Sequence, residues 1–144
     1  MKEIAKYSGC FVCGDKNDFG LKAKFYFQDN KAVTECVAHK HFEGYHDFYH
    51  GGITAALLDE VMIKALMARD IPAMTVELTV RYHKAVVIGQ KLLLTGYLEH
   101  QRGRLYLTRG EAKLESGEIV ASATGKYLRV RRDMESRLQE SPEG

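Results

Sequence analysis

Two stretches near the start of the chain alternate apolar and polar residues, which is the pattern of half-buried β-strands. They cover residues 21–28 and 32–40, and the turn-forming residues Asp29, Asn30 and Lys31 lie between them. The pattern therefore predicts a β-hairpin. The hairpin follows an irregular leader at residues 1–20 and precedes a loop, residues 41–49, that is rich in histidine and aromatic side chains.

A different pattern begins at Gly51, where apolar residues occupy nearly every side of a helix that is predicted to run to Arg69. Asp70 and Pro72 then stop the helix. Its polar residues are Thr54, Asp59, Glu60, Lys64 and Arg69. A helix this apolar must be almost surrounded by protein, as expected when a β-sheet wraps around it.

Four strand-like segments follow the helix, at residues 74–85, 91–100, 105–114 and 119–130. Short glycine-containing turns at residues 101–104 and 115–118 connect the last three segments as hairpins. The element order predicts an α+β fold in which an antiparallel sheet of about six strands packs on one long helix. We expect a single domain at residues 21–130, followed by a charged, flexible tail at residues 131–144.

Asp59 is the residue of the predicted helix that the apolar pattern does not explain. The residues one turn away on either side are Ala55, Ala56, Met62 and Ile63, which are all apolar. An ionisable group costs several kcal/mol to bury without a partner. Asp59 must therefore face an opening, stay protonated, or meet a group from another chain.

The adjacent carboxylate, Glu60, has an ordinary explanation. Lys64 follows it by one helical turn, at the spacing of an intrahelical ion pair. Asp59 has no such partner, so the position is more typical of an active-site acid than of a structural one. The alternative is an aspartate that accepts a hydrogen bond from a backbone amide of a neighbouring strand.

Composition and charge narrow the possible function classes. With 144 residues, 45% hydrophobic and 28% charged, the chain has the composition of one globular domain. Its 21 basic and 19 acidic residues nearly cancel, which argues against nucleic acid as the main partner. The N-terminus lacks the apolar core of a signal peptide, and no apolar run approaches the roughly 18 residues that span a membrane. We therefore expect a cytoplasmic protein without a membrane partner.

Three cysteines, Cys10, Cys13 and Cys36, cannot all pair within one chain, so reduced thiols are expected. Cys10 and Cys13 form a Cys-x-x-Cys pair, and His39 and His41 could complete a set of four zinc ligands. A single Cys-x-x-Cys is common by chance. We therefore interpret the two cysteines as small, half-buried loop residues and predict no metal and no cofactor.

The element order, with one almost wholly apolar helix, resembles the hot-dog fold, in which a curled sheet wraps around a central helix. His50-Gly51-Gly52, with Asp59 nine positions after the histidine, resembles the acyl-CoA thioesterases of the phenylacetate-pathway type in the hot-dog superfamily. Residues 75–82 (TVELTVRY) resemble the strand that follows the helix in that family. Residues 10–14 (CFVCG) and 20–21 (GL) resemble the leader of one of its branches, so the likeness spans most of residues 10–130.

This resemblance implies a role for each residue of the motif. Asp59 would act as general base on a water, or would attack the thioester carbonyl itself. The Gly51 amide, at the positive end of the helix dipole, would hold the developing oxyanion, and Gly52 would let the substrate approach the backbone. Thr75 would orient the attacking water, and His50 would position the carbonyl or the Gly51 amide. The structural alternatives are a flexible helix start, an ordinary strand threonine and a loop-packing histidine.

The resemblance also implies the partners. In the family, the glycine end of one helix meets the carboxylate of the partner's helix, so we expect a homodimer with the active site at the interface, or a dimer of dimers. The phosphates of coenzyme A require cations, for which Arg81 and Lys84 are candidates. The aromatic loop suits an aryl or a medium aliphatic acyl group, and both remain open. Glu43 and Gly44 depart from the asparagine or glutamine that related thioesterases often carry there.

Two other functions compete with the thioesterase. A non-catalytic module that binds acyl-CoA or another small ligand would keep the fold without turnover. A hot-dog dehydratase or hydratase is suggested by residues 41–44 (HFEG), but its carboxylate would fall near Ala56 and Leu57, which cannot do acid–base chemistry. The sequence therefore predicts an acyl-CoA thioesterase as the first hypothesis.

Overall fold

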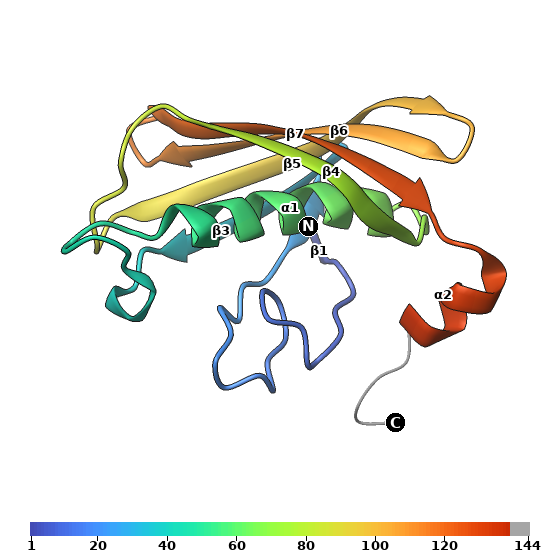
Figure 1. The fold of residues 1–144 in the computed structure, drawn as a ribbon, viewed down its shortest axis with the longest axis horizontal. Helices are drawn as coiled ribbons and strands as arrows, with labels where there is room; N and C mark the ends of the chain where they lie inside the picture. The colour runs from blue at the N-terminus through green and yellow to red at the C-terminus, as the bar shows by residue number, and fades with distance from the viewer. Residues whose placement is uncertain (139–144) are drawn as a thin grey trace.

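The computed structural model describes residues 1–138 and has one antiparallel sheet with a long helix packed against it (Figure 1). The strands are β1 (Lys2–Glu3), β2 (Tyr26–Gln28), β3 (Lys31–Val37), β4 (Ala73–Tyr82), β5 (Lys91–Arg102), β6 (Leu105–Leu114) and β7 (Ile119–Arg129). The helices are α1 (Gly51–Met67), α2 (Arg132–Leu138) and a short 3-10 turn at Lys40–Phe42. None of the helices in this described part is long and apolar enough to cross a membrane.

The strands form a single seven-stranded sheet in the order β1-β2-β3-β5-β6-β7-β4. After β3 the chain enters α1, which crosses the sheet and returns the chain to the opposite edge as β4. Strands β5, β6 and β7 then fill the middle of the sheet as a meander, and β7 closes the fold by pairing with β4. Because β4 pairs only with β7 among the described strands, its other side is a free edge.

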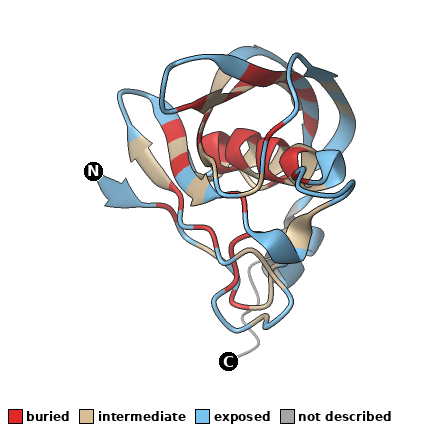
Figure 2. Ribbon diagram, turned by 90° about the vertical axis from the view of Figure 1, so that its left-hand side faces the viewer, coloured by how far each residue is buried: buried red, intermediate tan, exposed pale blue. Residues whose placement is uncertain are grey.

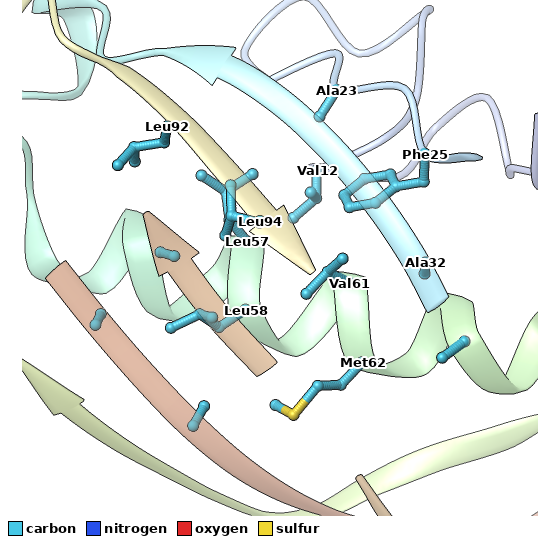
Figure 3. Close-up of a cluster of buried hydrophobic side chains, with 14 of the residues drawn as sticks. Val12, Ala23, Phe25, Ala32, Leu57, Leu58, Val61, Met62, Leu92 and Leu94 are labelled. Atoms are coloured by element: carbon cyan, nitrogen blue, oxygen red, sulfur yellow. The ribbon is translucent and has the colours of Figure 1, made fainter. Parts of the chain in front are cut away.

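Helix α1 is the centre of the core. Figure 2 shows it inside the curl of the sheet, and eight of its 17 residues are buried. Leu57, Leu58, Val61 and Met62 have no exposed surface, and Figure 3 shows Leu57 beside Leu94 and Val61 toward Phe25. Burying a side chain of this size contributes about 1.5–3 kcal/mol, so the helix and the sheet stabilise each other.

The close contact between helix and sheet requires a glycine on β5. A Cβ atom at Gly96 would lie 2.5 Å from the carbonyl oxygen of Val61 and 2.9 Å from the amide nitrogen of Met62. The backbone of α1 therefore lies directly on the backbone of β5 at this point. Gly110 of β6 faces the same helix, but there an added Cβ would meet the flexible Met62 side chain at 3.1 Å.

The fold class is confirmed, with differences at the ends of elements. The sheet gains the two-residue strand β1, formed by part of the leader that was predicted to be irregular. Helix α1 ends at Met67, short of the predicted Arg69, because Asp70 adopts a left-handed conformation (φ 59°) and the amide of Ile71 turns back to Leu66.

The first predicted strand is shorter than expected. Residues 21–25 are not part of the sheet, because Lys22 has a positive φ of 52° and the amides of Leu21 and Ala23 bond to the leader instead. Residues 132–138 form α2, a helix that the pattern did not predict, and residues 139–144 of the expected tail lie outside the described residues. The domain boundaries at residues 20 and 130 stay a prediction.

Replacing Gly96 with alanine should destabilise the protein by about 1–3 kcal/mol, because the new methyl group would overlap helix backbone that cannot rotate away. Gly110→Ala is the matched control, since its methyl group would meet the flexible Met62 side chain at 3.1 Å and the nearest backbone atom, the Thr95 oxygen, only at 3.4 Å. Urea denaturation of both variants measures the difference. Equal stability of the two variants would show that the helix can move away from β5 at little cost.

Candidate active site

His50 caps the N-terminus of α1. Its backbone is extended (φ −66°, ψ 127°), and its Nδ1 atom accepts a hydrogen bond of 2.8 Å from the amide of Gly52. A neutral imidazole that accepts through Nδ1 carries its proton on Nε2. A Cβ at position 52 would lie 2.9 Å from Cε1 of His50, so Gly52 leaves room for the capping ring. The Gly52 amide therefore serves the cap, and its role toward substrate stays a prediction.

The Gly51 amide donates no hydrogen bond within the described residues. The carbonyl oxygen of Gly51 accepts a hydrogen bond of 2.6 Å from the hydroxyl of Tyr82, which belongs to β4. This contact holds the first residue of α1 against the sheet while its N–H stays available. An unpaired amide at the positive end of a helix dipole can polarise a carbonyl oxygen.

A cavity of about 1100 Å³ opens beside the N-terminus of α1. Its lining includes the capping residue, the two glycines, Tyr82 and Lys84. The ammonium group of Lys84 pairs with Glu118 at 3.0 Å. Arg81 precedes Tyr82 in β4 and is exposed, but it does not border this cavity. Of the two cations predicted to bind substrate, the structure brings only Lys84 to the helix N-terminus.

Asp59 lies midway along α1, where two hydroxyl groups hold its carboxylate. Its Oδ1 atom accepts hydrogen bonds from the hydroxyls of Thr75 at 2.9 Å and Tyr127 at 2.8 Å. The Tyr127 hydroxyl also lies 3.1 Å from the backbone carbonyl oxygen of Asp59. No described residue donates to Oδ2. The carboxylate is therefore fixed in orientation through one oxygen, while the other can accept a proton or approach a carbon.

The pairing of β4 with β7 brings Thr75 and Tyr127 to the same point. The two residues are directly opposite in the register, and a β-bulge follows Thr75, between it and Glu77. Bulges of this kind redirect side chains at the edges of sheets. Thr75 is exposed on the free edge, so the carboxylate of Asp59 lies next to open surface.

Tyr127 is a candidate site residue that the sequence analysis missed. It is fully buried, and burial together with the neighbouring Asp59 charge raises the pKa of its phenol, which keeps the hydroxyl as a donor. A Cβ at Gly125 would lie 2.6 Å from the Tyr127 ring, so this glycine makes room for it. The alternation of residues 119–130 placed Tyr127 on one face of a strand, but only the strand register shows that this face meets Asp59.

The glycine end of α1 and the carboxylate of the same helix are too far apart to act together. Asp59 is eight positions after Gly51, which corresponds to about 12 Å along a helix that rises about 1.5 Å per residue. An oxyanion donor and a base or nucleophile must both lie within about 3 Å of the same reacting group. A complete site therefore needs one of the two from elsewhere.

The predicted alternative zinc ligands are not brought together. In the described residues, Cys10 and Cys13 form a group with Glu60, not with His39 and His41, and all three ligand atoms lie within 4.8 Å of one another. The predicted ion pair of Glu60 with Lys64 is present, with 3.8 Å between the charged atoms.

The loop before the helix supports the cap. The Glu43 carboxylate accepts a hydrogen bond from the amide of Asp47 at 3.0 Å, and a Cβ at Gly44 would lie 3.3 Å from the His50 ring. These two residues, which depart from the family pattern, therefore shape the loop around His50. The side chains of His46 and Asp47 pair with each other on the surface at 3.3 Å.

Comparison with known proteins shows the family. The sequence matches the model of the thioesterase superfamily over residues 46–121, more than half of the chain. The chain therefore belongs to the thioesterase superfamily. The acyl-coenzyme A thioesterase 13 proteins of Homo sapiens and Mus musculus are 28% and 33% identical to it over 81 residues, covering 55% of this chain and 53% of each relative. The chain thus matches about half the length of these curated relatives.

Solved structures support the same fold. The crystal structure of another thioesterase superfamily protein matches with a TM-score of 0.80 and 26% identity, covering 84% of this chain and 60% of that one. The E. coli PaaI protein from the phenylacetic acid degradation operon matches with a TM-score of 0.69 and 22% identity, covering 73% and 81% of the two chains. The chain therefore has the hot-dog fold of these thioesterase structures.

Removing the Tyr127 hydroxyl should cost about 1.5–3 kcal/mol of unfolding free energy, the usual value of a hydrogen bond to a charged group. The change is Tyr127→Phe, measured by urea denaturation. Tyr106→Phe is the control, because Tyr106 pairs with Tyr127 in the sheet and is buried, but its hydroxyl bonds to no described residue. Equal losses in both variants would contradict a specific bond to Asp59.

Proposed function

We propose that this protein is an acyl-CoA thioesterase that hydrolyses an aryl- or medium-chain acyl-CoA to the free acid and coenzyme A. The observation that carries the proposal is the Asp59 carboxylate, which Thr75 and Tyr127 hold through one oxygen beside the free edge of the sheet. The thioesterase superfamily and the names of the acyl-coenzyme A thioesterase relatives support the same activity.

The chemistry requires a polarised carbonyl and an oxygen nucleophile. The Gly51 amide would donate to the thioester carbonyl oxygen and stabilise the negative charge that develops on it. Oδ2 of Asp59 would take a proton from a water that attacks the carbonyl carbon, or would attack that carbon directly to form a mixed anhydride that water then opens. In both routes the C–S bond breaks and coenzyme A leaves as its thiol. Through its hydrogen bond to Oδ1, Thr75 would orient the Asp59 carboxylate, whether this carboxylate attacks directly or positions the attacking water.

Both parts of the site would come together in a homodimer. The free edge of β4 is ten residues long and carries exposed apolar side chains, with Met74 48% and Val76 56% exposed. A long apolar edge strand is normally paired or covered. Antiparallel pairing of two β4 strands about a two-fold axis would set the two α1 helices side by side in opposite directions. Gly51 of the partner subunit would then approach Asp59. Two such dimers could form a tetramer.

The remaining predicted residues would act on the coenzyme A part and the acyl group. Lys84 borders the cavity at the helix N-terminus and offers a cation for a phosphate, and Arg81 offers a second at the edge of the sheet. His50 would keep the Gly51 amide in position through its cap on Gly52. The aromatic lining from Tyr45, Phe48 and Tyr82 suits an aryl or a medium aliphatic acyl group.

A non-catalytic acyl-CoA-binding protein is the alternative, because Glu43 and Gly44 replace the amide side chain expected near the carbonyl. The dehydratase hypothesis has less support. Leu57, near the position its carboxylate would need, is fully buried and apolar.

Asp59→Asn should reduce the turnover of acyl-CoA thioesters by about a hundred-fold or more, since the amide can neither accept the proton nor attack. The measurement is release of free thiol from a panel of aryl and short to long aliphatic acyl-CoA thioesters. Asp70→Asn is the matched control, because Asp70 is exposed beyond the end of α1 and asparagine tolerates its left-handed backbone. Hydrolysis by the native protein at an unchanged rate in Asp59→Asn would remove Asp59 from the mechanism. No hydrolysis at all would favour the binding protein.

A mixture of two inactive variants tests whether the site is shared between subunits. Gly51→Pro removes the amide N–H, yet proline suits the first position of a helix and the extended backbone of His50 before it. If the partner's Gly51 serves Asp59, each heterodimer of Gly51→Pro with Asp59→Asn contains one intact site and one doubly defective site. Equal amounts refolded together should recover about a quarter of native activity, as random pairing of subunits in a two-fold dimer gives. The absence of recovery in confirmed heterodimers would place both groups of each site in one chain.

A further inference from the structure

A second cluster of reactive side chains lies where the leader folds back onto α1. The ligand atoms of Cys10, Cys13 and Glu60 lie within 4.8 Å of one another, and Cys10 Sγ is 3.8 Å from Glu60 Oε2. Cys13 is 3% exposed, and the Glu60 side chain is 17% exposed. Neither cysteine is used by the proposed thioesterase chemistry.

The turn that carries both cysteines is tightly constrained. The Cys13 amide donates to the Cys10 sulfur at 3.4 Å, and the Gly14 amide donates to the Cys10 carbonyl oxygen at 2.9 Å. A Cβ at position 14 would lie 2.3 Å from the backbone oxygen of Ser8, so only glycine fits there. Backbone N–H groups directed at a sulfur stabilise its thiolate form. The turn therefore presents two sulfurs in a fixed arrangement.

A buried positive charge lies next to this cluster. Lys64 is 1% exposed, lies 3.8 Å from Glu60, and donates to the carbonyl oxygen of Ala5 in the leader. A lysine this deeply buried requires anionic neighbours.

We propose that Cys10, Cys13 and Glu60 bind one zinc ion, which ties the leader to the central helix. Sulfur and oxygen ligands at tetrahedral positions around zinc, with bonds of about 2.3 and 2.1 Å, lie about 3.6 Å apart, close to the 3.8 Å between Cys10 and Glu60. Two thiolates and one carboxylate around a divalent cation leave one negative charge, which Lys64 balances. A disulfide between the two cysteines would leave the convergence of Glu60 and Lys64 on this turn unexplained.

A water would provide the fourth ligand. Ser8, two residues before Cys10, is buried, and its hydroxyl has no hydrogen-bond partner among the described residues. A buried polar group of this kind needs a partner such as a bound water. The zinc site is separate from the proposed catalytic residue, since consecutive residues of a helix point about 100° apart around its axis. Asp59 faces β4 and β7 while Glu60 faces the leader.

Cobalt substitution tests the proposal without relying on enzyme activity. The full-length protein is reduced, stripped of metal with a chelator and titrated with Co²⁺ under anaerobic conditions. Binding of one Co²⁺ per chain should give an intense thiolate-to-cobalt charge-transfer band in the near ultraviolet, with visible bands typical of tetrahedral cobalt, and Zn²⁺ should displace it. Bound metal should also raise the thermal midpoint of unfolding, and the rise should grow with the logarithm of the free metal concentration once the site is saturated.

Three variants assign the ligands. Cys10→Ser and Cys13→Ser should each weaken Co²⁺ binding and lower the intensity of the charge-transfer band by at least half, and Glu60→Gln should weaken Co²⁺ binding at least ten-fold while keeping the full band at saturating metal. Cys36→Ser is the control, because Cys36 lies on β3 outside the cluster, and it should bind like the native protein. Circular dichroism confirms that each variant is folded.

Two results would overturn the proposal. The first is native protein with three reduced thiols that gives no charge-transfer band at millimolar Co²⁺. The second is a band that keeps its full intensity in folded Cys10→Ser and Cys13→Ser proteins but disappears in Cys36→Ser.

Discussion

The structure depends on packing one apolar helix, eight of whose 17 residues are buried, into a curled sheet. Helix α1 lies in a curled sheet whose strands come from both sides of it in the sequence, and its contact with β5 is so close that only glycine fits at position 96. A charged side chain on such a helix is not automatically hydrated by bulk solvent. Each polar side chain must therefore find a partner in the sheet, in the leader or in another molecule. Both candidate sites of the protein arise at such positions.

Asp59 and Glu60 show how neighbouring carboxylates acquire different chemistry. Both are acidic residues in the middle of an apolar helix, and they point in different directions. Asp59 accepts hydrogen bonds from Thr75 on the free edge and from the buried Tyr127, and both go to the same oxygen, so the other has no described donor. Glu60 meets a buried lysine and two cysteines beneath the leader. The first environment suits proton transfer or nucleophilic attack, and the second suits a cation.

Most of the fold could be predicted from the sequence because the strongest signals were local. The helix start at Gly51, the hairpin turns and the alternating strands were predicted from neighbouring residues alone. Errors appeared where distant segments compete for the same backbone groups: residues 21–25 bond to the leader, and the leader contributes β1. Of the site, the positions of Asp59, Thr75 and the capping His50 could be predicted from a motif. Tyr127 could not, because it is 68 residues away from Asp59 and reaches it only through strand register.

By itself, the sequence determined that one apolar helix would be wrapped by an antiparallel sheet and that this helix would carry an aspartate without a local partner, because both follow from spacing along the chain. Only the tertiary structure decided what each polar residue meets. It brought the hydroxyls of Thr75 and Tyr127 within hydrogen-bond distance of Asp59. It placed Glu60 beside the two cysteines, where His39 and His41 had been considered, and it left β4 as a free edge. These contacts depend on the register of the paired strands and on the crossover through α1. Both bring together residues that are far apart in the sequence, and neither produces a periodic pattern of residues along the chain.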